Sequence, residues 1–253
     1  MASQSDTRLE TSAPCSVAQS LALASVPTAI GSHAPVLRTR RGQALALSCD
    51  GTEMAFIVRS GVLTLQVTLP DSSRQIVAML FPGDVVRSSY APPRAEASLV
   101  SAGAGGVWRM RLSALETLAA ADPAVRRYLD TAAASRVARQ ALHAATLGQF
   151  DCEQRVATLL VELALRTGVS SPSGVVFEFP FGRKDVADYL GLNPDTLSRI
   201  MSRLKEARLL GHSQRNRAVV RDLAALAARS PAARSLSEMG GVHFGEASLG
   251  TAL

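Results

Sequence analysis

Two short helical patterns meet at Gly191 in the C-terminal half of the chain. Their apolar residues recur at three- and four-residue spacing, the period of a helix with one buried face: Val186, Ala187, Leu190, Leu197, Ile200, Met201 and Leu204. Gly191 permits a tight turn, Asn193 can cap the second helix, and Pro194 can occupy its first position without losing a hydrogen bond. The pattern predicts helices over Arg183–Leu190 and Pro194–Arg208, joined as a helix-turn-helix.

The chain around these helices is strongly basic. Residues 182–221 hold nine Lys or Arg against four Asp or Glu, so they carry a net charge of +5 out of +6 for the whole chain. The flanking pattern is that of a winged helix, with a helix at Cys152–Arg166, a strand at Val175–Phe179, and short strands near Leu209–His212 and Ala218–Arg221. Clustered positive charge on such a domain favours a polyanion partner. We therefore predict that the domain binds double-stranded DNA.

The outward face of the second helix carries residues suited to reading DNA bases. Arg199 can donate two parallel hydrogen bonds to guanine, Asp195 can accept one from cytosine or orient the arginine, and Ser198 can donate or accept. Other basic residues are expected to contact phosphates, which adds affinity without sequence information: Arg203, Lys205, Arg215 and Arg217. The competing interpretation is that Asp195 and Arg199 form only a surface ion pair, worth roughly 0.2 to 0.5 kcal/mol.

The N-terminal half has the pattern of a small antiparallel β structure. From Val36 to Met110, short apolar runs are broken by turn residues, which is typical of a sandwich or barrel. We therefore expect an α+β protein with these segments: a flexible tail at 1–32, a β domain at 33–121, a long helix at 122–148, a winged helix-turn-helix at 149–229 and a second flexible tail at 230–253. Both predicted tails lack sustained periodicity.

The long helix is predicted to start at Pro123, with Asp122 as its N-cap, because no Gly or Pro follows until Gly148. An apolar stripe with several small residues runs along it: Val125, Leu129, Ala132, Val137 and Ala141. Such a stripe either packs on the helix's own domain or forms the seam of a homodimer. We favour the homodimer, because a helix that crosses between two domains has little else to bury against.

The three cysteines, Cys15, Cys49 and Cys152, are far apart in the chain. Their odd number argues against a disulfide framework and no pair has metal-ligand spacing, so we expect a reducing compartment and no metal site. Cys152 begins a predicted helix and is a candidate redox switch, although a buried or idle thiol is the simpler interpretation. The chain shows neither a signal-peptide pattern nor a run of roughly 20 apolar residues. We therefore expect a cytoplasmic protein without a membrane span.

Over Val36–Leu226 these features resemble the CRP/FNR superfamily of bacterial regulators. The resemblance rests on the motifs Ser60-Gly61-Val62-Leu63, Phe81-Pro82-Gly83-Asp84 and Phe150-Asp151, and on Ser198 and Arg199, which are typical of the FNR and FixK-like branch. It implies a cyclic-nucleotide-binding-type β-roll, a dimerisation helix, and RNA polymerase as a partner. It also implies that Asp195, Ser198 and Arg199 of two copies read a palindromic site of the TTGAT type. Asp195 is one methylene shorter than the Glu common in the family, which leaves the bases read open.

The sensory half departs from the best-known members of that family. Nucleotide-binding members carry Gly-Glu followed by Arg-Ser or Arg-Thr, whereas residues 85–96 here lack Gly-Glu and place Ala95 after Arg94. Oxygen-sensing members hold an iron-sulfur cluster on four cysteines, three of them near the N-terminus, where this chain has only Cys15. We therefore expect neither a standard cyclic-nucleotide site nor a 4Fe-4S cluster, and we predict no cofactor.

Two other classes of function compete with a transcription regulator. The first is a small-ligand sensor module of cyclic-nucleotide type whose winged helix contacts a protein rather than DNA. Such a module would bind its partner with a flat salt response, whereas DNA affinity falls steeply with salt. The second is an enzyme. The sequence argues against an enzyme, because it contains no nucleophile elbow, P-loop, Rossmann glycine pattern or zinc spacing, and its acids are scattered.

Overall fold

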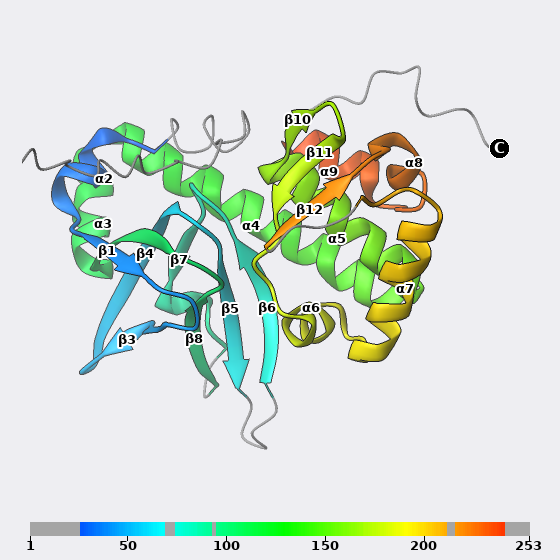
Figure 1. The fold of residues 1–253 in the computed structure, drawn as a ribbon. Coiled ribbons are helices and arrows are strands. Elements are labelled where there is room, and N and C mark those ends of the chain that lie inside the picture. The colour runs from blue at the N-terminus through cyan, green and yellow to red at the C-terminus, as the bar shows by residue number, and fades with distance from the viewer. Residues whose placement is uncertain (1–25, 69–73, 93–94, 212–215, 241–253) are drawn as a thin grey trace, which may run out of the picture.

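The computed structural model describes residues 26–68, 74–92, 95–211 and 216–240. These residues form an N-terminal β-roll, a long helix, and a C-terminal domain of helices with a small sheet (Figure 1). The α+β class and the order of the three parts agree with the expectation from the sequence. Most of the predicted N-terminal tail and the last part of the predicted C-terminal tail lie outside the described residues.

The β-roll consists of two antiparallel sheets. The first contains β1 (Val36–Thr39), β3 (Ser48–Cys49), β4 (Thr52–Ser60), β7 (Val85–Arg87) and β9 (Gly105–Arg111), and the second contains β2 (Ala44–Ala46), β5 (Leu63–Thr68), β6 (Arg74–Leu80) and β8 (Glu96–Ser101). Side chains from both sheets, among them Phe56, Leu65 and Val107, share one buried core. The antiparallel β structure predicted for this half is therefore confirmed.

The turn that joins the two sheets explains one of the sequence motifs. Gly61, between β4 and β5, has a φ of +76°, in the left-handed region. A Cβ atom at this position would lie 2.7 Å from the carbonyl oxygen of Ala104. Glycine meets both conditions without strain, because it has no Cβ and populates positive φ readily. The motif thus marks the point where the chain crosses from the first sheet to the second.

Helices cover one face of the first sheet: α2 (Thr28–His33), α3 (Leu112–Ala121) and the first half of α4 (Pro123–Gln149), while η1 (Ser88–Tyr90) follows β7. α4 begins as predicted, because the Asp122 carboxylate accepts a hydrogen bond from the Ala124 N–H at 2.8 Å and Pro123 holds the first position. α2 corrects the predicted tail at 1–32, since Ile30 is fully buried in the roll. Tertiary packing holds this helix, which is too short to show a period of its own.

The C-terminal domain packs helices against a three-stranded sheet of order β10-β11-β12. Its elements are α5 (Cys152–Thr167), β10 (Val169–Ser171), β11 (Gly174–Glu178), α6 (Arg183–Leu190), α7 (Pro194–Glu206), β12 (Arg217–Val220), α8 (Leu223–Ala227) and α9 (Ala233–Gly240). The helix-turn-helix has nearly its predicted bounds. The strand predicted at Leu209–His212 is reduced to one bridge between Leu210 and Val220, and His212 lies outside the described residues.

The folded domain continues beyond residue 230, where the second flexible tail was predicted to begin. Leu236 of α9 is buried in the same core as α5, and the Ser230 and Thr158 hydroxyls are hydrogen-bonded at 2.8 Å. The prediction of a tail is therefore wrong for residues 230–240. The segment is too short for its own pattern to predict a helix, and it gains its stability from packing beside α5.

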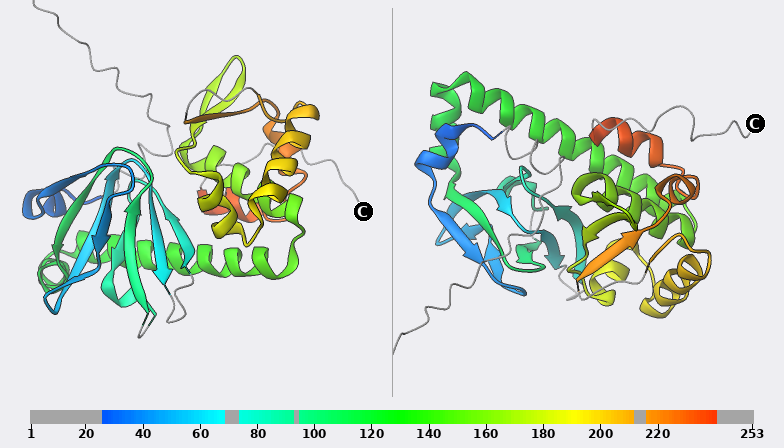
Figure 2. Two further views of the ribbon diagram at one scale, coloured as in Figure 1. Left: turned by 60° about the horizontal axis from the view of Figure 1, so that its bottom comes forward. Right: turned by 45° about the horizontal axis from the view of Figure 1, so that its top comes forward.

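The two domains share a buried apolar interface. Ile76, Met79 and Phe81, from β6 and the turn after it, belong to the same core as Leu160 of α5 and Leu190 of α6. Figure 2 shows α4 running along the roll and the C-terminal domain lying beside the β5–β6 edge of the roll. The first helix of the helix-turn-helix is therefore packed against the roll.

Candidate nucleic-acid interface

α7 has one buried and one exposed face, as its sequence predicts. The Asn193 side-chain oxygen accepts a hydrogen bond from the Asp195 N–H at 2.8 Å, and Pro194 holds the first helical position. The inward face consists of Leu197, Ile200 and Leu204, which are all buried. In Figure 1, α7 lies on the side of the C-terminal domain that faces away from the roll. Its outward face is therefore open to a large partner.

The outward face of α7 carries the three side chains predicted to read bases. Asp195 and Arg199 are exposed, and Ser198 is half-buried with its hydroxyl donating to the Pro194 carbonyl at 2.9 Å. Among the ion pairs of the described residues, none joins Asp195 to Arg199. The surface ion pair that competes with base reading is therefore not formed here. The Ser198 oxygen can still accept a hydrogen bond from a partner.

The basic side chains predicted to contact phosphates lie beside this face. The Arg203 side chain is 62% exposed, and its Nη1 lies 3.7 Å from Oε2 of Glu153. Lys205 is exposed in the last turn of α7, and Arg217 is half-buried on β12. Arg215 lies outside the described residues. This ion pair joins Arg203 to the first turn of α5.

The first half of α4 has a different role from the one predicted. Val125 is fully buried and Leu129 is 3% exposed, and both belong to the core of the roll. Ala132 is half-buried against the same core. The prediction that Val125 and Leu129 form a dimer seam is therefore wrong, because their side chains are already covered within one chain. The competing interpretation, packing on the helix's own domain, holds for this half.

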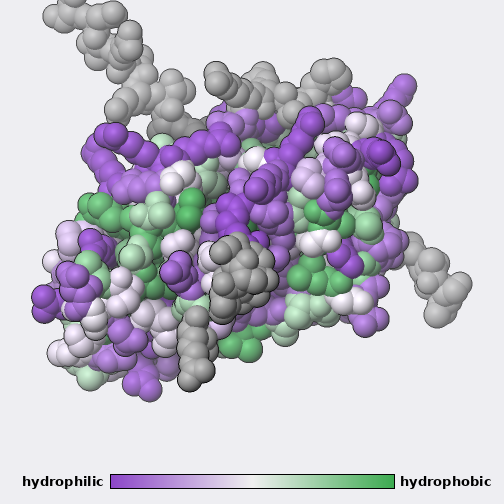
Figure 3. All heavy atoms as spheres, turned by 90° about the horizontal axis from the view of Figure 1, so that it is seen from below, coloured by the Kyte–Doolittle hydropathy of each residue, from purple (hydrophilic) through white to green (hydrophobic). Residues whose placement is uncertain are grey.

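The second half of α4 carries an exposed apolar stripe. Val137 is 65% exposed, and small exposed residues continue its line at three- and four-residue spacing: Ala134, Ala141 and Ala144. The helical period could have separated the two faces, because Val137 lies twelve residues beyond Val125 and so about 120° round the helix from it. The described residues on the face of the molecule shown in Figure 3 form no such continuous stripe, because their hydrophobic side chains occur in separate small patches among hydrophilic ones.

Cys152, the candidate redox switch, is exposed at the first position of α5. The Asp151 carboxylate accepts a hydrogen bond from the Gln154 N–H at 2.9 Å, and the Gln154 side chain accepts one from the Asp151 N–H at 3.1 Å. This reciprocal capping fixes the start of the helix beside the thiol. The exposure contradicts the interpretation as a buried thiol, and the redox role stays a prediction.

The remaining predictions concern a metal site, an iron-sulfur cluster, a nucleotide site and a membrane span. Among them, no group of three His, Cys, Asp or Glu side chains is arranged to hold a metal ion. The chain has three cysteines in all, too few for the four thiolates of an iron-sulfur cluster. Arg94, in the stretch compared with the nucleotide-phosphate cassette, lies outside the described residues. None of the described helices is both long enough and apolar enough to cross a bilayer.

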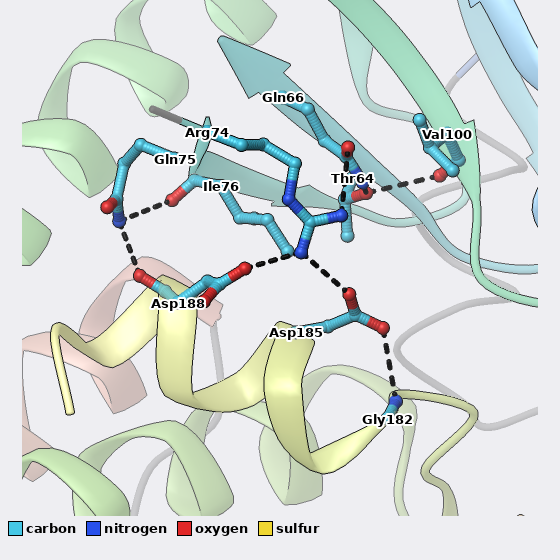
Figure 4. A network of polar contacts seen from close by, with 9 residues as sticks. All are labelled: Thr64, Gln66, Arg74, Gln75, Ile76, Val100, Gly182, Asp185 and Asp188. Carbon is cyan, nitrogen blue, oxygen red and sulfur yellow. Dashed lines mark hydrogen bonds and ion pairs between the residues drawn. The ribbon is translucent and has the colours of Figure 1, made fainter. Parts of the chain in front are cut away.

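A polar network connects the roll to the helix-turn-helix (Figure 4). Nη2 of Arg74, on β6, donates to Oδ1 of Asp185 at 3.3 Å and also to the carboxylate of Asp188, both on α6. The Gln75 side chain donates to the Asp188 carbonyl. Asp185 in turn accepts from the Gly182 N–H, at 3.3 Å, where α6 begins. The partners of Arg74 lie 111 and 114 residues away in sequence, so no local pattern could have indicated them.

Comparisons with known proteins agree with this arrangement. Residues 154–229 match the family model of the Crp-like helix-turn-helix domain. The chain is 30% identical over 175 residues to the nitrogen fixation regulation protein FixK of Azorhizobium caulinodans, which covers 69% of this chain and 70% of that protein. It is 27% identical over 174 residues to the transcriptional activator protein Anr of Pseudomonas protegens, with 68% and 70% covered. The structure of FixK2 from Bradyrhizobium japonicum superposes with a TM-score of 0.66 at 27% identity, covering 78% of this chain and 97% of that one.

Proposed function

The chain belongs to the CRP/FNR family of DNA-binding transcription regulators, in its FixK-like branch, and on this basis we propose that it acts as a homodimer whose two α7 helices read a palindromic DNA site. The observation that carries the proposal is the division of α7 into a buried apolar face and an outward face with Asp195 and Arg199. A recognition helix needs this division, because its outward side chains must reach base edges in the major groove.

Each half-site in this proposal is of the TTGAT type. Arg199 donates two hydrogen bonds to a guanine, and Asp195 accepts from a cytosine or orients Arg199. Ser198 serves as an acceptor, because its hydroxyl proton is bonded to the Pro194 carbonyl. Arg203, Lys205 and the basic residues near β12 contact phosphates and set the affinity rather than the sequence read.

The homodimer in this proposal forms through the second half of α4. Val137 and its exposed neighbours at helical spacing supply an apolar strip with small residues, which lets two helices approach closely. A two-fold axis along this strip would present two α7 helices to two half-sites, as palindromic DNA requires. RNA polymerase is the second protein partner that we propose, since family members named as activators act on transcription.

The variant Arg199→Ala tests the base-reading assignment. The unchanged protein first selects its site from random DNA, and affinities for that site are then measured by fluorescence anisotropy. We expect the variant to bind roughly 5- to 150-fold more weakly, because one bidentate base contact is worth about 1 to 3 kcal/mol. Arg126→Ala, which removes an exposed arginine from α4, is the matched control and should bind normally. Equal binding by Arg199→Ala and the unchanged protein would overturn the assignment.

The salt dependence of binding separates DNA recognition from the rival function, a sensor module that contacts a protein. Neutralising phosphates releases counterions, so the logarithm of the DNA affinity should fall linearly with the logarithm of salt concentration. Arg203→Ala should weaken binding to all DNA sequences alike and make this dependence shallower. A flat response to salt would favour the protein partner instead.

A further inference from the structure

A groove of about 290 Å³ lies between α7 and the sheet of the C-terminal domain. Its walls come from one side of α7, from β12, and from the segment that leads from β11 into α6, elements that Figure 1 labels. Sites for small ligands are clefts of roughly 300 to 1,000 Å³, so this groove lies at the small end of that range. The described residues that line it include none from the roll or from α4.

Apolar side chains line much of the groove. Phe179 and Met201 are half-buried and pack against the core of the C-terminal domain. Three buried side chains of that core also belong to the lining: Val186, Leu197 and Leu210. A ligand with an apolar body would lose water-exposed apolar surface on contact with these side chains, which favours binding.

The charged side chains among the described lining residues are all basic. They are Arg183 at the start of α6, Lys205 in the last turn of α7, and Arg217 at the start of β12. Among the ion pairs of the described residues, none includes these three. Glu178, the cross-strand neighbour of Arg217, does not line the groove. The groove therefore suits an anionic ligand.

Contacts with DNA phosphates would use only part of this lining. Lys205 and Arg217 are predicted phosphate contacts, and such a contact needs a positive charge at the surface. The half-buried apolar side chains add nothing to it, because a phosphate group gains nothing from leaving water for an apolar surface. Apolar walls with a few polar groups that fix orientation are instead typical of a small-ligand site. The lining as a whole therefore matches a molecule with an apolar body and one anionic group.

We propose that this groove binds an amphipathic carboxylate, a monocarboxylate with an extended apolar body. The body lies along α7 against Met201 and Phe179, and the carboxylate accepts charge-assisted hydrogen bonds from the basic side chains, with Lys205 as its principal partner. The lining on α7 extends from Leu197 to Lys205, about 12 Å at 1.5 Å per residue. A medium-chain fatty acid such as octanoate therefore fits along it.

The bound carboxylate competes with DNA, because the groove and the DNA interface share side chains. Ser198 lines the groove and is proposed to contact bases, and Lys205 and Arg217 line it and are proposed to contact phosphates. A ligand held by these side chains leaves them unavailable to DNA. The competition rests on the proposed function, whereas the existence of the ligand site does not.

Isothermal titration calorimetry of the full chain without DNA tests the site. Sodium octanoate is compared with octanamide, which keeps the chain without the charge, and with sodium acetate, which keeps the charge without the chain. We expect saturable binding of octanoate, binding of octanamide that is about fivefold weaker or more because its head group is neutral, and no saturable binding of acetate. Absence of saturable octanoate binding, or equal affinities for octanoate and octanamide, would overturn the proposal.

Matched variants connect octanoate binding to the groove. Lys205→Gln should weaken the octanoate affinity about threefold to fivefold, because it removes one exposed ion pair. Lys184→Gln removes an exposed lysine outside the lining and should keep the affinity. Ser202→Glu places a carboxylate at an exposed position of the lining and should weaken octanoate binding by like-charge repulsion. An unchanged octanoate affinity in both Lys205→Gln and Ser202→Glu would overturn the groove as the site.

A second measurement tests the competition with DNA. Fluorescence anisotropy gives the affinity for the selected DNA site while octanoate replaces acetate at constant sodium concentration. At an octanoate concentration about nine times its dissociation constant from calorimetry, we expect the apparent DNA affinity to fall about tenfold, as for two ligands that exclude each other. An unchanged DNA affinity there would overturn the competition. A protein that selects no DNA site would instead contradict the proposed function, and calorimetry without DNA would still decide the ligand site.

Discussion

Gly191 and Arg208 occupy the same left-handed position at the ends of α6 and α7, with φ of +61° and +59°. In both places the chain closes with the bonds of a Schellman motif. The closing N–H to carbonyl bonds run from Leu192 to Ala187 and from Leu209 to Leu204. Glycine adopts this conformation without strain, whereas the Cβ of an arginine makes it unfavourable. α6 therefore ends with the favoured residue and α7 does not.

Substitutions at these two positions should change stability in opposite directions. Arg208→Gly should raise the free energy of unfolding by about 1 kcal/mol, because it relieves the left-handed strain. Gly191→Ala should lower it by about 1 kcal/mol for the converse reason. Urea denaturation followed by circular dichroism, without DNA, measures both. Shifts of the same sign in the two variants would contradict this explanation.

His143 should make stability depend on pH. Its pKa is lowered from 6.5 to about 4 by burial, while a hydrogen bond involving the Tyr189 backbone acts in the opposite direction. Between these two pH values the unfolded chain binds a proton that the folded chain does not, so stability falls as the pH is lowered from 6.5 toward 4. His143→Gln should reduce this slope, as measured by urea midpoints across the window. The same slope in both proteins would exclude His143 as its source.

At the scale of the element, the two halves of α4 face different surroundings. Leu129 in the first half is buried in the roll, whereas Val137 in the second half is exposed. A helix repeats about every 3.6 residues, so a single list of apolar positions along it can combine residues from different faces. The two halves should therefore respond differently to substitution.

Charge on the outward stripe of α4 should affect assembly rather than folding. Val137→Glu should shift the protein toward monomer with little change in monomer stability, and sedimentation velocity over a range of concentrations measures this. Leu129→Ala should instead lower the free energy of unfolding by about 2 to 5 kcal/mol, because it leaves a cavity in the core. Ala124→Glu, exposed on a different face of α4, is the control and should leave the mass unchanged. A dimer that withstands Val137→Glu would place the seam elsewhere.

For the whole molecule, two arginines make ionic contacts between the roll and the C-terminal domain. Arg74 of β6 contacts Asp185 and Asp188 of α6, and Arg166 of α5 donates through Nη2 to both carboxylate oxygens of Asp84, at 2.8 and 2.9 Å. Both contacts join elements whose apolar side chains also meet in the interface between the domains. α6, the first helix of the helix-turn-helix, is therefore attached to the roll by ionic contacts as well as by apolar packing.

Loss of the Arg74 contacts should loosen α6 from the roll. We expect Arg74→Ala to increase hydrogen exchange in β6 and α6 while β4 and β9, in the other sheet, stay protected. A double-mutant cycle with Asp188→Ala should give a coupling of about 0.5 to 3 kcal/mol, as for side chains in one network. Hydrogen exchange followed by mass spectrometry measures the first effect. Unchanged exchange in α6 would show that apolar packing alone holds the domains together.

The parts of the molecule whose signals are local follow from the amino-acid sequence. The bounds of α6, the start of α4 and the outward face of α7 depend on caps, turn residues and helical periodicity, and these act between residues a few positions apart. For the same reason the helical period of α7 is sufficient to place Asp195 and Arg199 on its exposed face. The predicted β pattern likewise indicates a small antiparallel β structure without stating how its strands pair.

Which surfaces are free and which are covered depends instead on the tertiary structure. It buries Val125 and Leu129, packs residues 233–240 onto α5 and joins Arg74 to α6. It also buries Nε and Nη2 of Arg136 where the described residues offer them no hydrogen-bond partner. Each of these outcomes depends on contacts between residues that are far apart in the chain. Burial and pairing are properties of such contacts, so a local pattern can show that a residue is apolar or charged but not what will cover or neutralise it.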